Sequence, residues 1–200
     1  MSRRYRTAIS WVKRALLLLP WLYACESPVA LPSGCVRDAS RARRVIDTLA
    51  GIADGEVLLG PDTAGQICFG SGPGTYLPGP VLALPSDTSD EEAAARLVHL
   101  LHHVRHGRGL VAGERARANE DCDALVDQAL REEAIAHVLE MQVRESLGVT
   151  PARPFVNEAS VIALPRDARA DAVLAHLRDH PEGGGGYEPL GRDYRERCGR

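Results

Sequence analysis

Four segments of the chain show the apolar spacing of amphipathic helices, with hydrophobic residues three and four positions apart on one side. The clearest one begins at Ser89, where Glu92 three residues later completes a capping box, and it ends before Gly107. A second long helix is expected to end at Gly148. The predicted helices cover residues 37–52, 89–106, 123–147 and 167–179.

Short apolar runs bounded by turn residues predict a few strands, at residues 56–59, 66–69, 81–84 and 161–164. Residues 70–80 are rich in glycine and proline and are expected to form a loop, without the spacing of a phosphate-binding loop. The tail after residue 182 is expected to be coil. Together these elements predict an α+β fold that is mainly helical and carries a small sheet.

The first 24 residues have the pattern of an export signal peptide. An arginine-rich stretch precedes an apolar run at residues 15–22, which is too short to span a bilayer. The run leads into Leu22-Tyr23-Ala24-Cys25, which resembles the lipobox of bacterial lipoproteins, with Tyr23 in place of the usual small residue. The resemblance implies a lipid on Cys25 that anchors an exported protein in the cell envelope, and Glu26 favours the outer membrane. The alternative is an ordinary cleaved signal and a secreted or periplasmic protein.

The composition is that of an ordinary globular domain, with 44% hydrophobic and 26% charged residues. The net charge of −3 gives no basic surplus, so we expect no nucleic acid as a partner. We expect a signal peptide at 1–24, a lipid-anchored tether at 25–36, a folded domain at 37–182 and a flexible C-terminal tail at 183–200.

Cysteine counting agrees with export. With Cys25 acylated, an even number of cysteines remains, and an oxidising compartment favours two disulfides. The three possible pairings stay open from the sequence alone. The cysteines concerned are Cys35, Cys68, Cys122 and Cys198.

Four histidines fall within eight residues of the helix predicted at 89–106. At about 100° per residue, His99, His103 and His106 share one stripe, whereas His102 points off it. Two histidines four positions apart on a helix bring two imidazole nitrogens within reach of one metal ion, which makes His-x-x-x-His a recurring zinc half-site. His99 and His103 are therefore candidate metal ligands.

The second long helix offers a third ligand. On the same helical projection Glu133 lies near the centre of a broad apolar face, with His137 and Glu140 beside it. A glutamate on a buried face is costly unless it is paired or bound to a cation. The histidine stripe gives Glu133 such a role, and a structural ion pair with Arg96 or Arg144 is the alternative.

The run His99-Leu100-Leu101-His102-His103, followed thirty residues later by Glu133, resembles the zincin metallopeptidases of the gluzincin kind. In that family His-Glu-x-x-His on one helix and a glutamate on a later helix hold zinc. The resemblance covers residues 81–147. It implies a zincin-like fold, zinc as the cofactor, His99, His103 and Glu133 as its ligands, and a peptide or protein as the molecule that the domain binds.

Leu100 departs from the family pattern at the position of the catalytic glutamate, the general base of the hydrolysis. A leucine cannot accept a proton, and Glu140 or His137 would replace the base only with unusual geometry. We therefore expect a degenerate metallopeptidase-like domain, a pseudoenzyme, in a cell-envelope lipoprotein. The alternative is a non-catalytic binding or scaffold lipoprotein whose histidines are structural.

Overall fold

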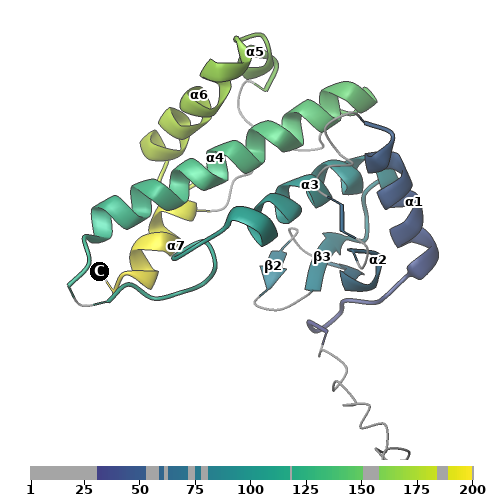
Figure 1. Cartoon of the computed structure of the whole chain (residues 1–200), viewed down its shortest axis with the longest axis horizontal. Helices are drawn as coiled ribbons and strands as arrows, with labels where there is room; N and C mark the ends of the chain where they lie inside the picture. Colours follow the sequence, from purple (N-terminus) through teal and green to yellow (C-terminus); the bar gives the residue numbers. More distant parts are fainter. Residues whose placement is uncertain are drawn as a thin grey trace, which may run out of the picture.

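The computed structural model describes residues 31–52, 59–60, 63–71, 75–77, 81–117, 119–150, 158–183 and 189–199. The signal peptide and Cys25 lie outside these residues. The fold is α+β, with helices predominating and one small sheet (Figure 1). The elements in chain order are α1 (Ala39–Ala50), α2 (Thr63–Gln66), β1 (Ile67–Gly70), β2 (Thr75–Leu77), β3 (Val81–Pro85), α3 (Asp90–His106), α4 (Cys122–Leu147), α5 (Glu158–Ile162), α6 (Arg166–Asp179) and α7 (Leu190–Arg197).

The four predicted helices are confirmed as α1, α3, α4 and α6, and their ends follow from local chemistry. The Ser89 side chain accepts a hydrogen bond from the backbone N–H of Glu92 at the start of α3. Asp121 caps α4 in the same way. Gly148 ends α4 in the left-handed region, at φ 66°, where a side chain would be strained.

The sheet has the strand order β1-β3-β2, with β1 parallel and β2 antiparallel to β3. The strands predicted at 66–69 and 81–84 are confirmed as β1 and β3. The prediction that residues 70–80 form only a loop is wrong, because Thr75–Leu77 pair with the open edge of β3. The pairing satisfies backbone hydrogen-bonding groups. A run of three residues is too short for its sequence pattern to predict a strand.

Two further expectations need correction. Val161 and Ile162 lie in the short helix α5 rather than in a strand, because an apolar run of four residues fits a buried helical turn as well as a strand. Of the strand predicted at 56–59, only Leu59 is described, and it is not in a strand.

The C-terminal tail is not coil, because residues 190–197 form α7, which packs against α4 and α6. Disulfides join Cys122 to Cys198 and Cys35 to Cys68, with Cα–Cα distances of 5.8 and 5.6 Å. The first of them ties the end of α7 to the start of α4. The folded domain therefore extends beyond residue 182, to Cys198.

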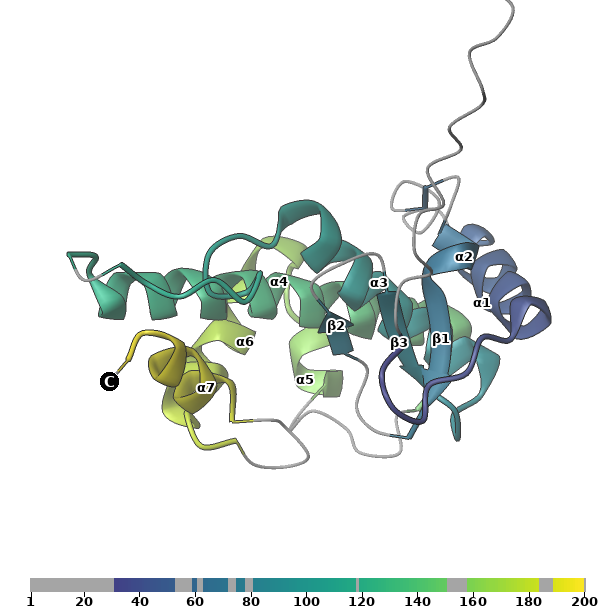
Figure 2. The same cartoon turned by 90° about the horizontal axis from the view of Figure 1, so that it is seen from below.

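Helix α4 packs against α3 and α6, which lie on opposite sides of it in Figure 1, and it contributes residues to two apolar clusters. In Figure 2, α1 and the sheet lie at one end of the molecule and α7 lies at the other. One cluster joins α1, the sheet and α3, and the other joins α4 to α5, α6 and α7. The helix pair α3–α4 makes the most extensive packing contact between two elements. Among the described residues, no helix is both long enough and apolar enough to cross a bilayer.

Candidate metal centre

The three residues singled out from the sequence meet between α3 and α4. His99 and His103 project from α3, one turn apart, and Glu133 projects from α4. Glu133 Oε2 lies 3.2 Å from His103 Nε2 and 3.4 Å from His99 Nε2, and the two Nε2 atoms are 3.1 Å apart. The three side chains are buried, with 5–7% of their surface exposed.

These three donor atoms form a nearly equilateral triangle of about the size of one face of a tetrahedral metal site. With metal–ligand distances of 2.0–2.2 Å, two donors of a tetrahedral site lie about 3.3–3.6 Å apart. The observed separations of 3.1–3.4 Å are close to that edge length. Atoms at this spacing can be bridged by one ion without a rearrangement of either helix.

His137 belongs to the same cluster. It lies one turn after Glu133 on α4, and its ring centroid is 4.6 Å from that of His99. His99, Glu133 and His137 form a buried group that can hold a metal ion, since one ligand atom of each lies within 4.8 Å of the others. The helical projection placed His137 beside Glu133 but did not single it out as a ligand.

Glu140 lies behind the histidines, on the side away from Glu133. The sequence patterns did not predict this position for it. Its Oε2 lies 2.9 Å from Nδ1 of His99 and 3.7 Å from Nδ1 of His137. A carboxylate on the outer nitrogen of a histidine holds the ring so that the other nitrogen faces a metal. Glu140, 1% exposed, thus faces the outer nitrogens of two imidazoles that converge on Glu133.

Two arginines hold Glu140 in place. Nη1 of Arg96 lies 3.1 Å from its Oε2, and Arg144 donates to its Oε1. Arg144 also donates to Glu92 at 2.7 Å and to Glu158 at 3.0 Å, which ties α4 to α3 and α5. The alternative that these arginines pair with Glu133 is wrong, because both contact Glu140, two turns further along α4.

Tyr194 reaches the site from α7. Its buried hydroxyl donates a hydrogen bond to Oε1 of Glu133, the oxygen that does not contact the histidines. This bond fixes the carboxylate and leaves Oε2 to the imidazoles. No pattern in the sequence indicates this contact, because the tail was expected to be coil.

The electrostatics of the cluster are those of buried carboxylates facing imidazoles. Burial lowers the pKa of His99, but the carboxylates of Glu133 and Glu140 outweigh it and raise that pKa to about 9. Burial raises the pKa of both carboxyls, yet His103 at Glu133 and Arg96 at Glu140 hold each well below its usual range. Burial lowers the pKa of His137 to about 4. The cluster thus combines two carboxylates that stay ionised with one imidazole whose pKa is raised, His99, and one whose pKa is lowered, His137.

The other residues of the histidine run lie outside this triangle. His106 is exposed. His102 is buried, and its Nε2 has no hydrogen-bond partner among the described residues. Leu100, 2% exposed, packs in the apolar cluster that joins α1, the sheet and α3. The residue that follows the first histidine of the run is thus part of the hydrophobic core.

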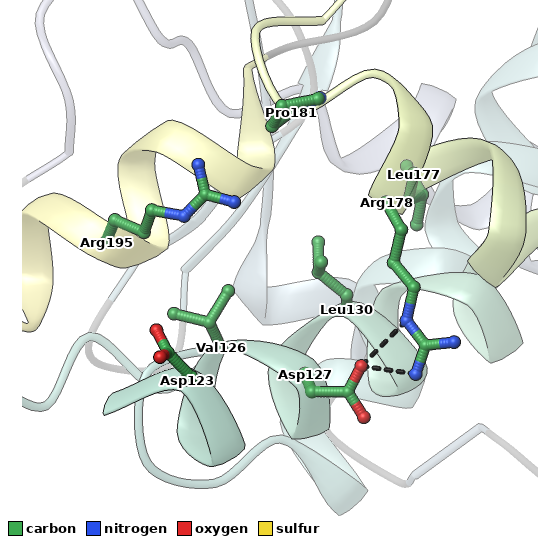
Figure 3. A pocket seen from close by; sticks show the side chains of 8 residues that line it. All are labelled: Asp123, Val126, Asp127, Leu130, Leu177, Arg178, Pro181 and Arg195. Atoms are coloured by element: carbon green, nitrogen blue, oxygen red, sulfur yellow. Dashed lines mark hydrogen bonds and ion pairs between the residues drawn. The ribbon is translucent and has the colours of Figure 1, made fainter. Parts of the chain in front are cut away.

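A separate pocket lies between the first half of α4, the end of α6 and α7 (Figure 3). Its floor is apolar, and its rim carries the Asp127–Arg178 ion pair. None of its lining residues belongs to the histidine–glutamate cluster, so this pocket does not open onto the candidate metal centre. The lining residues are Asp123, Val126, Asp127, Leu130, Leu177, Arg178, Pro181 and Arg195.

The chain matches no protein-family model, no curated protein and no solved structure. The likeness to zincins therefore has only the histidine–glutamate motif and the geometry of the site to support it.

Replacement of Arg144 by Met is expected to destabilise the fold by about 3–5 kcal/mol, because it removes one of the two arginines that neutralise the buried Glu140 and also unpairs the half-buried Glu92. Arg131→Met is the matched control, since Arg131 forms an exposed pair with Asp127 at the same spacing on the same helix. Its cost is expected to stay below about 0.5 kcal/mol. Urea unfolding followed by circular dichroism measures both, and equal effects would contradict a structural role for the buried pair.

Proposed function

We propose that this chain is a cell-envelope lipoprotein whose folded domain binds zinc at a degenerate metallopeptidase-like site and does not hydrolyse peptides. The observation that carries the proposal is the triangle formed by His99 Nε2, His103 Nε2 and Glu133 Oε2, with edges of 3.1–3.4 Å. Each donor is buried, and each is oriented by its helix toward the same point.

The charge of Glu133 supports a bound cation. Among the described residues, its ionic partners are the imidazoles of His99 and His103, whereas Glu140 has two arginines. An isolated buried carboxylate is costly. A divalent cation would satisfy Glu133 and both imidazoles together, and two imidazole nitrogens with one carboxylate oxygen are a ligand set that zinc favours.

The surrounding residues support binding without hydrolysis. A zinc ion in such a site polarises a carbonyl and activates water, but the reaction also needs a base placed to take a proton. Leu100 offers none and is packed in the core. Glu140 is held by Arg96 and Arg144 and faces the outer nitrogen of His99, so it positions a ligand and does not act as the base.

Export is supported by the two disulfides, since such bonds persist in oxidising compartments. The Cys35–Cys68 bond pins the C-terminal end of the predicted tether to strand β1, and Val36 bridges to Phe69 beside it. An anchor on Cys25 would then hold the domain close to the membrane surface, through a tether of about ten residues that spans at most ~35 Å.

In a second candidate function, the histidines have a structural role and bind no metal. His99 lies between the carboxylates of Glu133 and Glu140, which raise its pKa to about 9, so a protonated His99 would neutralise part of the cluster without a metal. In this case the domain is a binding or scaffold module of the envelope. Metal analysis separates the two candidates.

The full chain, expressed without a histidine tag, is expected to bind stoichiometric zinc. His99→Ala and His103→Ala are expected to abolish this binding because each removes a donor from the triangle. His102→Ala, the matched control from the same turn of α3, is expected to retain it. Metal content after gel filtration and titration calorimetry of the metal-free protein measure the effect. A wild-type chain that stays metal-free after exposure to zinc would favour the structural candidate.

The zinc-loaded chain is expected to leave a peptide library uncleaved, because no base stands at the position of Leu100. Mass spectrometry of the library after prolonged incubation tests this. Cleavage that is present in the wild type and lost in Glu133→Gln would contradict the pseudoenzyme hypothesis.

Expression in a bacterium fed with labelled palmitate is expected to give a labelled chain that partitions into detergent. Cys25→Ser is expected to lose both the label and the partitioning, since the thiol is the site of attachment. The double variant Cys35→Ser/Cys68→Ser is expected to keep the label, because it removes only a disulfide. An unlabelled wild-type chain in the aqueous phase would indicate a secreted protein.

A further inference from the structure

His137 lies beside the proposed ligands and is a candidate fourth donor. A fourth protein donor distinguishes a structural metal site from a catalytic one. His99 and Glu133 belong to two overlapping triads, of which one is completed by His103 from α3 and the other by His137 from α4. All four side chains are buried, with 5–7% of their surface exposed. Resting on the proposed metal binding, we infer that one ion takes all four donors and that the site is closed, as in structural zinc sites.

The orientation of His137 supports this assignment. Its Nδ1 faces the Glu140 carboxylate that also faces Nδ1 of His99, and the two ring centroids are 4.6 Å apart. A carboxylate close to the Nδ1 atoms of both imidazoles places their Nε2 edges on the side away from it, where a metal can bind. His137 also follows Glu133 by one turn, a spacing that places two ligands of one helix on the same ion.

The triad with His137 is wider than the triad with His103. Its ligand atoms lie within 4.8 Å of one another, whereas a tetrahedral edge is about 3.3–3.6 Å. Binding of all four donors to one ion therefore requires the imidazole of His137 to close a gap of up to roughly 1.5 Å.

A fourth protein ligand excludes hydrolysis for a second reason, besides the leucine at position 100. Catalytic zinc sites hold three protein ligands and keep one position for water or substrate, whereas structural sites have four protein ligands. With His99, His103, Glu133 and His137 bound, no position remains for a substrate carbonyl. The centre then joins α3 to α4 and has no catalytic part.

Cobalt(II) in place of zinc tests the closed site in the full chain. The wild type is expected to show the intense visible absorption of four-coordinate cobalt and no change on addition of azide, because no position is free to exchange. His137→Ala is expected to bind azide, with a shifted spectrum, and to weaken zinc binding at least about 100-fold, beyond the usual effect of losing an outer contact. His102→Ala is expected to leave the spectrum and the affinity unchanged.

Circular dichroism checks that the variants are folded. His137→Gln is a second variant without the imidazole, and its glutamine retains hydrogen-bonding capacity at this buried position. A wild-type cobalt spectrum that responds to azide, together with wild-type zinc affinity in a folded His137→Ala, would overturn the closed site and leave the three-donor site standing. Failure of the wild type to bind any metal would instead overturn the proposed function itself.

Discussion

Two glutamates two turns apart on one face of α4 impose the main constraint on this molecule. Glu133 and Glu140 are both buried in the contact between α3 and α4, the most extensive helix pair of the fold. Two carboxylates in that contact stay charged only if each has a partner of opposite charge or several hydrogen bonds. Arg96 and Arg144 form ion pairs with Glu140. The imidazoles and the hydroxyl of Tyr194 contact Glu133.

The rest of the architecture holds these partners in position. Arg144 spans from Glu140 to carboxylates on α3 and α5, so the charged layer also fastens three helices. The Cys122–Cys198 disulfide fixes α7 to the start of α4, which keeps Tyr194 over Glu133. A short helix with little apolar surface gains its place from one covalent bond and one buried tyrosine. The position of the Glu133 carboxylate therefore depends on Tyr194, which lies 61 positions further along the chain.

Local patterns in the sequence predicted the long helices and the meeting of three donors, because both follow from periodicity. Ser89 and Gly148 mark helix ends through their own backbone chemistry, and the helical projection put His99 and His103 opposite the apolar side. The missed features are long-range. The apolar run at Val161 has no periodicity of its own, and the burial of Tyr194 depends on a disulfide whose partner the sequence left open. The burial of Glu140 showed on the projection, but its arginine partners did not.

Two features of the proposed site favour binding without hydrolysis. Leu100 contributes to the apolar cluster on one side of α3, and His137 adds a donor on the other. Metal-assisted hydrolysis needs both a base and an exchangeable metal position, and the proposed site offers neither. A metal that binds the folded chain and not the unfolded one still stabilises it through mass action. Under the proposed function, a metal that joins α3 to α4 would stabilise the fold without any catalytic role.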